Sequence, residues 1–229
     1  MTDPFARIRP TAHQPLLGLS ILLVEDSQVA GEAIRVMCLR SGARLRRASS
    51  LAAAERHLRT WAPRVVIVDI GLPDGSGAGL IRRLDAAHPR VEALIGLSGD
   101  PDMDALASNA GADGFLAKPL GSLGALQEGI LRCLPPESRP ARPRAVDTSG
   151  VPADEAALLS DLVRAAALLD SRFDALSEDY LSRFLAGVAA TVGDRELVGA
   201  AADLRTPTPG ARARLAGMLG ERMAERRVG

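Results

Sequence analysis

The chain has 229 residues, 47% of them hydrophobic, and its 28 basic side chains balance its 28 acidic ones. This zero net charge gives no sign of a polyanionic partner held by bulk electrostatics, and two cysteines, Cys38 and Cys133, exclude a disulfide framework. No apolar run reaches the roughly 18 residues of a membrane span. Residues 1–18 carry three prolines and lack the apolar stretch of a secretory signal. We therefore expect a flexible N-terminal extension on a soluble cytoplasmic protein with no membrane partner.

Residues 19–134 alternate between short apolar runs and amphipathic stretches. Continuous apolar runs, typical of parallel strands buried on both faces, occupy residues 21–24, 65–68, 93–97 and 114–117. A segment that is polar on one face, residues 43–48, is expected to form an edge strand. Helical patterns lie between the strands, at residues 27–40, 50–60, 77–87, 102–110 and 122–134. The order predicts an α/β domain with a doubly wound, five-stranded parallel sheet.

Site-type residues follow four of these five strands. Glu25 and Asp26 end the first strand, Asp69 ends the third, Ser98 ends the fourth, and Lys118 ends the fifth. Ligands of such sheets bind beyond the carboxyl ends of the strands, so these side chains should converge at one rim. Lys118 is also the only lysine of a chain that otherwise uses arginine for positive charge. A compact ammonium fits a small anionic cavity better than a planar guanidinium fork does.

Residues 19–134 resemble the receiver domain of two-component response regulators, a flavodoxin-like fold. The resemblance is carried by LLVEDS, VVIVDIGLPDGSG, LIGLSGD and GADGFLAKPL, in the family's order and spacing, and covers about half of the chain. It implies a phosphoprotein of a phosphorelay, which receives a phosphoryl group from a histidine kinase or a histidine phosphotransfer protein.

The resemblance also assigns roles to individual residues. It implies that Asp69 is the phospho-acceptor and that Glu25 and Asp26 form an acidic pair, with Glu25, Asp26 and Asp69 as magnesium ligands. Gly71 is expected to offer its backbone carbonyl to the same ion. Clustered carboxylates repel one another, and a hard cation such as Mg²⁺, which prefers oxygen ligands, relieves that repulsion.

Three further residues complete the expected switch. The resemblance implies that Ser98 and Lys118 contact the phosphoryl group and that Phe115 is the aromatic switch position. Catalysis of phosphoryl transfer depends mainly on positioning the group and neutralising its charge. A hydroxyl and an ammonium can serve these two roles. Ser98 would move toward the new group and leave space for Phe115 to rotate inward. The peptide bond between Lys118 and Pro119 is expected to be cis, as in the family.

A predicted linker separates residues 19–134 from the rest of the chain. Residues 135–152 read PPESRPARPRAVDTSGVP, which lacks apolar periodicity and predicts a stiff, extended linker. Apolar positions at helical spacing then predict four amphipathic helices in a small all-α bundle, residues 153–229, for output or dimerisation. We interpret Phe173, Tyr180 and Phe184 as core residues of this bundle.

The function of the predicted bundle stays open between three alternatives. Residues 151–229 hold ten arginines and no lysine against twelve acidic residues, a net charge of about −2, which disfavours a DNA-binding output. The stretch from Leu197 to Leu219 weakly resembles a histidine phosphotransfer domain, but no histidine lies in this half, so only a degenerate relative fits. A homodimer contact is equally compatible with the pattern.

The sequence favours a signalling switch over an enzyme. Haloacid-dehalogenase-like phosphatases also use an aspartyl nucleophile on such a sheet, but they need a second aspartate two residues later, where this chain has Gly71. We therefore expect a non-enzymatic phospho-acceptor with slow self-dephosphorylation, whose helices act through protein contacts. A transcription regulator with an atypical DNA-binding bundle is the alternative.

Overall fold

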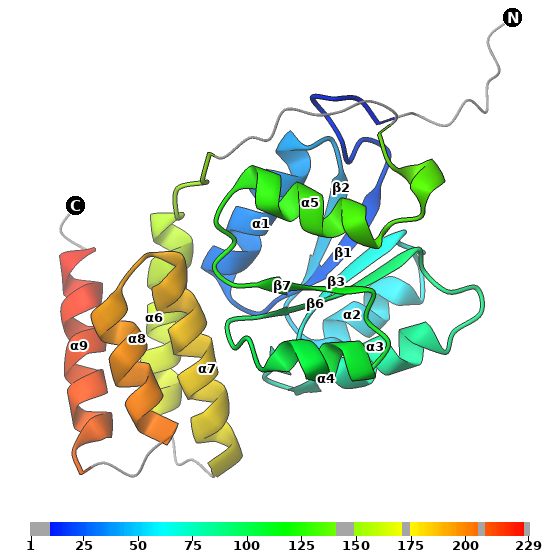
Figure 1. The fold of residues 1–229 in the computed structure, drawn as a ribbon. Coiled ribbons are helices and arrows are strands. Elements are labelled where there is room, and N and C mark those ends of the chain that lie inside the picture. Colours follow the sequence, from blue (N-terminus) through cyan, green and yellow to red (C-terminus); the bar gives the residue numbers. More distant parts are fainter. Residues whose placement is uncertain (1–9, 141–148, 171–174, 206–208, 227–229) are drawn as a thin grey trace, which may run out of the picture.

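The computed structural model describes residues 10–140, 149–170, 175–205 and 209–226, and the side chains of residues 175–177 are left out of the description. Figure 1 shows a sheet flanked by helices, with a separate group of helices beside it. The fold predicted from the apolar pattern is confirmed in both parts.

Five parallel strands form the sheet in the order β2-β1-β3-β6-β7. Their bounds are Ser20–Val24 for β1, Arg44–Ala48 for β2, Val65–Asp69 for β3, Ala93–Ser98 for β6 and Gly114–Ala117 for β7. The strands rich in continuous apolar residues, β1, β3 and β6, occupy the centre, where both faces are covered. The partly polar β2 lies at the edge, as predicted. This order places the carboxyl ends of β1 and β3 side by side, in register at Val24 and Val68.

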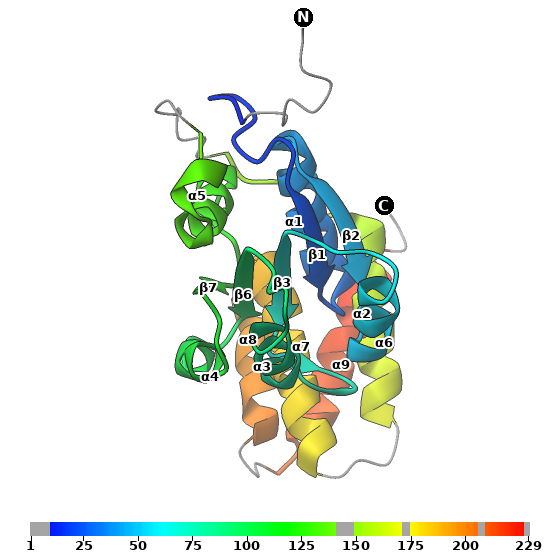
Figure 2. The same ribbon diagram turned by 90° about the vertical axis from the view of Figure 1, so that its right-hand side faces the viewer.

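Helices cover both faces of the sheet (Figure 2). One face packs on α1 (Gln28–Arg40) and α5 (Leu123–Cys133), and the other packs on α2 (Leu51–Leu58), α3 (Gly77–Asp85) and α4 (Met103–Asn109). Successive strand residues point to opposite faces, so Leu23 joins the first core and Leu22 and Val24 join the second. Burial of each aliphatic side chain stabilises the fold by about 1.5–3 kcal/mol. A one-residue slip of a strand would turn these side chains to the opposite face, so their burial fixes the strand register and the positions of the residues at the rim.

A short hairpin follows β3, and the apolar pattern gave no sign of it. Strands β4 (Gly71–Leu72) and β5 (Gly75–Ser76) pair in antiparallel fashion directly after Asp69. Gly77 then brings the chain back against β3, where a Cβ would stand 2.0 Å from the carbonyl oxygen of Asp69. Only glycine permits this approach.

Parts of the two segments expected to be extended pack on the α/β body. Leu16, in the predicted N-terminal extension, is fully buried in the core beneath α1. In the predicted linker, Pro136–Ser138 form a turn of 3-10 helix, and the buried Ser138 hydroxyl bonds Arg64 and Glu92. Both segments supply apolar or hydrogen-bonding groups to this body. Residues 1–9 and 141–148 lie outside the described residues.

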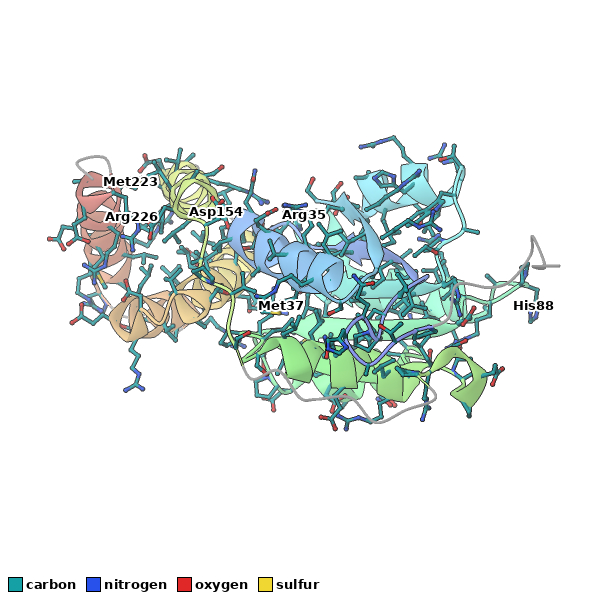
Figure 3. The ribbon with its side chains drawn as sticks, turned by 90° about the horizontal axis from the view of Figure 1, so that it is seen from above. Arg35, Met37, His88, Asp154, Met223 and Arg226 are labelled. Carbon is teal, nitrogen blue, oxygen red and sulfur yellow. The ribbon has the colours of Figure 1, made fainter. Side chains whose placement is uncertain are left out.

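The four C-terminal helices are α6 (Glu155–Asp170), α7 (Ala175–Thr191), α8 (Arg195–Ala202) and α9 (Ala211–Glu225), with a 3-10 turn, η2 (Asp203–Arg205), after α8. Their shared apolar core also takes in Val29 of α1. Figure 3 shows α6 lying beside α1, while His88 stands at the opposite end of the α/β part. Phe184 joins this core as expected, whereas Phe173 falls outside the described residues. Among the described helices, none is long and apolar enough to cross a membrane.

Candidate phosphorylation site

Lys118 lies at the centre of the residues that the strand ends bring together. Its Nζ stands 2.7 Å from Asp69 Oδ2 and 2.9 Å from Glu25 Oε2, and only 9% of its side chain is exposed. Three different strands, β1, β3 and β7, therefore meet through one ammonium. The Lys118–Pro119 peptide bond is cis, as expected.

The remaining oxygens of the two carboxylates accept backbone hydrogen bonds. Asp69 Oδ1 accepts from the Gly71 N–H at 2.9 Å, and Glu25 Oε1 accepts from the Ser27 N–H at the same distance. These bonds fix the orientation of both side chains. Asp69 thus presents a buried, fixed carboxylate at the end of a central strand.

Asp26 is held by residues of the C-terminal helices, which the sequence analysis did not anticipate. The Tyr180 hydroxyl donates to Asp26 Oδ2 at 2.5 Å, and Arg164 Nη2 lies 3.1 Å from the same oxygen. Arg164 also donates to the Asp26 carbonyl oxygen at 3.1 Å. Tyr180 is therefore more than a core residue of the helices, which corrects our interpretation of it.

Asp161 of α6 forms a second contact with the rim. Its carboxylate, 1% exposed, accepts hydrogen bonds from the Ser27 hydroxyl at 2.9 Å, the Gln28 N–H at 2.9 Å and the Val29 N–H at 3.0 Å. These groups form the N-terminus of α1, where unpaired N–H donors and the helix dipole favour a negative charge. The one signal in the sequence is a carboxylate among the apolar positions of α6, between Leu158 and Leu162.

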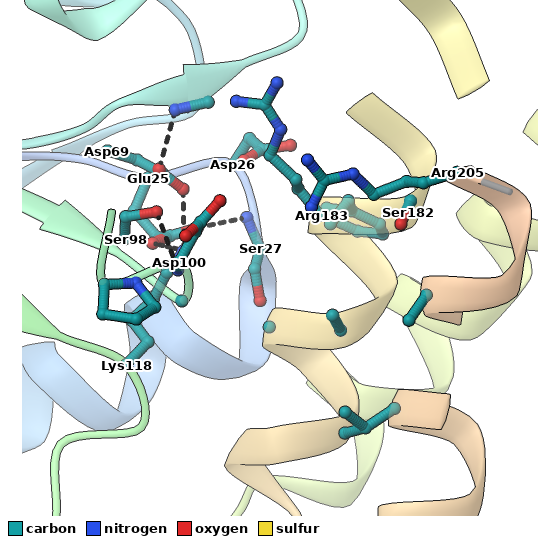
Figure 4. Close-up of a pocket in the computed structure, with 18 residues that line it drawn as sticks. Glu25, Asp26, Ser27, Asp69, Ser98, Asp100, Lys118, Ser182, Arg183 and Arg205 are labelled. Carbon is teal, nitrogen blue, oxygen red and sulfur yellow. Dashed lines mark hydrogen bonds and ion pairs between the residues drawn. The ribbon is translucent and has the colours of Figure 1, made fainter. Parts of the chain in front are cut away.

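A cavity of about 210 Å³ opens beside these residues. Asp69, Ser98, Gly71 and Lys118 line it from the sheet side, and helices α7 and α8 line its other side (Figure 4). The Ser98 hydroxyl accepts a hydrogen bond from the Asp100 N–H at 3.1 Å. Phe115, half-buried, packs beside α4 in the second core of the sheet rather than lining the cavity.

Burial, together with the neighbouring charges, shifts the pKa values of this site. Burial, with the nearby Asp69 and Asp26 carboxylates, raises the pKa of Glu25 to about 8, although Lys118 opposes the shift. Burial also raises the pKa of Asp26. For Lys118, burial acts against the charge, but Asp69 and Glu25 outweigh it and hold the pKa above its ordinary value. Lys118 therefore keeps its charge among these acidic groups, while Glu25 and Asp26 hold their protons more strongly than free carboxylates do.

Comparison with known families identifies the α/β part. The response regulator receiver domain model matches residues 21–130. These residues form a receiver domain. The match begins in β1 and ends in α5, so it contains all five strands and every strand-end residue described above.

Several known proteins are similar to about half of this chain. The KDP operon transcriptional regulatory protein KdpE of Escherichia coli is 34% identical over 109 residues, 47% of this chain and 48% of that protein. The probable transcriptional regulatory protein TcrX of Mycobacterium tuberculosis is 28% identical over 115 residues, 50% of this chain and 47% of that protein. The chain thus spans about half the length of the curated relatives it matches.

Solved structures also align with about half of this chain. A putative response regulator from Chloroflexus aurantiacus aligns with a TM-score of 0.47 and 24% identity, over 50% of this chain and 96% of that one. The receiver domain of the sensor histidine kinase PA1611 from Pseudomonas aeruginosa, described with magnesium coordinated in its active site cleft, aligns with a TM-score of 0.45 and 27% identity. That alignment covers 50% of this chain and 95% of that one.

The raised pKa of Glu25 predicts how pH acts on the metal-free receiver domain. In EDTA, the free energy of unfolding should fall as pH rises from about 5 to about 8, at up to about 1.4 kcal/mol per pH unit. The folded chain holds the Glu25 proton up to pH about 8, whereas the unfolded chain releases it near 4.5, so the folded state binds more protons across this window. Urea unfolding at several pH values measures the slope. Glu25→Gln should flatten it, and a wild-type stability that rises across the window would contradict the prediction.

Proposed function

We propose that Asp69 accepts a phosphoryl group and that the chain is a response regulator whose C-terminal helices carry the output. The observation that supports this most directly is the buried Asp69 carboxylate, which Lys118 and the Gly71 N–H hold at the edge of a cavity. A fixed oxygen nucleophile beside a buried cation, with room for a tetrahedral group, suits acyl phosphate formation.

The donor set at the rim fits a magnesium ion. Glu25, Asp26 and Asp69 each offer a carboxylate oxygen within 4.8 Å of the others, and all three are buried. Mg²⁺ prefers oxygen ligands, which is what these three side chains offer. Asp26 and Asp69, with the carbonyl of Gly71, would hold the ion, and Glu25 would support it. When bound, Mg²⁺ neutralises charge on the phosphoryl oxygens and on the carboxylates.

The residues of the chain then perform a simple transfer. An oxygen of the Asp69 carboxylate attacks phosphorus, the new P–O bond forms, and the bond from phosphorus to the donor's leaving group breaks with its electron pair. Lys118, already 2.7 Å from Asp69, neutralises negative charge on the transferred oxygens. Ser98, which also lines the cavity, would offer its hydroxyl to one of those oxygens.

The transfer would then shift the equilibrium between two arrangements of Ser98 and Phe115, one for the free and one for the phosphorylated Asp69. The phosphoryl group adds about −1.5 to −2 charges beside Ser98 and Lys118. Ser98 would turn toward it, and Phe115, packed one strand away on β7, would follow into the space that Ser98 leaves. A ligand shifts such an equilibrium only as far as it binds one arrangement better than the other.

We further propose that the output passes through protein contacts of the C-terminal helices. A histidine kinase or phosphotransfer protein is the proposed donor. Transcriptional control, which the names of KdpE and TcrX state for those proteins, is the second candidate, although the similarity covers only about half of this chain. Their net charge of about −2 provides little attraction for DNA. Salt-dependent DNA binding by the full chain would favour the second candidate.

Labelling by acetyl phosphate tests the proposed function. With Mg²⁺, the intact protein should gain the mass of one phosphoryl group, and peptide mapping after borohydride trapping should place it at Asp69. EDTA should reduce the labelling rate at least about 100-fold, because the clustered carboxylates then keep their mutual repulsion. Failure of the magnesium-loaded chain to gain mass, or a label at another residue, would refute the proposal.

A further inference from the structure

The C-terminal helices build one wall of the cavity over Asp69. Residues on this wall come from α7, α8 and η2, and they include Arg183 and Arg205. Gly187 of α7 lies directly over Lys118, since a Cβ at this glycine would stand 3.9 Å from Nζ. The helix backbone therefore closes the cavity above the same ammonium that holds Asp69.

The two arginines of this wall share one carboxylate. Asp179, one turn earlier on α7, pairs with Arg183, and its Oδ1 lies 3.4 Å from Arg205 Nε. Two guanidinium groups against one carboxylate leave a surplus positive charge. Within the part of the chain that the structure describes, Arg183 Nε is also buried without a hydrogen-bond partner. Figure 4 shows both arginine side chains extending from the helices toward the strand ends.

We propose that Arg183 and Arg205 bind the phosphoryl group carried by Asp69, so that the acyl phosphate lies in a site built by both halves of the chain. This inference rests on the proposed function of Asp69. The phosphoryl group would enter the same cavity as the guanidinium groups, and the planar arginine fork matches phosphate oxygens in two parallel hydrogen bonds. Arg183 Nε supplies one donor that is not bonded to Asp179, which pairs with Nη2 of the same arginine.

This arrangement determines how phosphorylation of Asp69 would affect the attachment of the C-terminal helices. The phosphoryl group and Asp179 compete for the same two arginines, and the phosphoryl group carries more negative charge than one carboxylate. Phosphorylation would therefore draw α7 and η2 toward the receiver domain and strengthen their attachment. By reciprocity, attachment of the helices would tighten binding at Asp69 by the same factor.

Beryllofluoride with Mg²⁺, a stable mimic of the acyl phosphate, tests the inference on the full chain by isothermal titration calorimetry. Arg183→Ala should weaken beryllofluoride binding roughly tenfold or more, because charged hydrogen bonds to the mimic are lost. Arg183→Lys, which keeps the charge but not the fork, should recover part of the affinity. Asp179→Asn should act in the opposite direction and tighten binding about threefold, since it frees both arginines. Arg195→Ala, an exposed arginine of α8, serves as the matched control.

Each result decides the inference. Equal affinity, within twofold, for the wild type, Arg183→Ala and Arg195→Ala would overturn it, as would weaker binding by Asp179→Asn. If Arg183→Ala does not fold, the Asp179→Asn result decides alone, because a purely structural role would not tighten binding. A wild-type chain that binds no beryllofluoride would refute the proposed function of Asp69 instead.

Discussion

Asp69→Asn is expected to abolish labelling by acetyl phosphate, a loss of at least about 10³-fold. The amide keeps the size of the side chain, and its oxygen can still accept the Gly71 N–H, but it cannot act as the nucleophile. The substitution would also leave Glu25 as the one carboxylate paired with Lys118. Mass spectrometry of the intact protein, at matched donor and Mg²⁺ concentrations, measures the loss directly.

Asp74→Asn provides the matched control for this variant. Asp74 lies in the same loop, five residues later, but it is exposed and bonds the Leu51 and Ala52 N–H groups at the start of α2. Its loss should leave labelling unchanged while slightly destabilising α2. Persistent labelling of Asp69→Asn at a rate close to that of Asp74→Asn would place the acceptor elsewhere.

The α/β half was predictable because its signals are local and repeated. Each continuous apolar run became a strand of the sheet, and the first three of these strands are fully buried, whereas β7 and the partly polar β2 lie at the two edges. A parallel sheet carries the carboxyl ends of its strands to one rim, so Glu25, Asp69 and Lys118 were expected to meet, and they do. The β4–β5 hairpin was missed because two-residue strands have no periodicity to detect.

The contacts between the two halves could not be predicted, because they depend on packing across more than 130 residues. Tyr180 and Phe184 share the spacing of an apolar helix face, and the sequence gives both the same role. Only docking of α7 on the rim separates them, since it places the Tyr180 hydroxyl on Asp26 while Phe184 stays in the core. The role of Asp161 could not be predicted either, because it accepts from the backbone N–H groups of Gln28 and Val29, which any sequence at the start of α1 would offer.

These contacts place the C-terminal helices where a protein donor would need to approach. Tyr180 and Arg164 occupy one oxygen of Asp26, and α7 closes the cavity over Lys118. A small donor such as acetyl phosphate would need only the cavity, whereas a proposed donor histidine on another protein would need the helices to move aside. The ratio of the two labelling rates would therefore depend on how tightly the helices attach.

Asp161→Ala is expected to loosen that attachment by about 2–4 kcal/mol. The substitution leaves the Ser27 hydroxyl and the Gln28 and Val29 N–H groups without their shared acceptor and removes a negative charge from the N-terminus of α1. Hydrogen exchange at the first turn of α1 should accelerate roughly 30-fold or more, because these amides are freed whenever the helices detach. Exchange in the central strands β1 and β3 should change far less, since their hydrogen bonds do not involve α6.

Asp203→Ala separates this effect from the general loss of a carboxylate. Asp203 lies on the same helical half, but it is about half exposed and pairs with the exposed Arg214, a contact worth at most about 1 kcal/mol. Its loss should leave exchange at α1 unchanged. Asp161→Asn, which keeps one acceptor oxygen but loses the charge, should fall between the two. If Asp161→Ala and Asp203→Ala gave the same protection at Val29, the Asp161 carboxylate would not be what attaches the helices to the receiver domain.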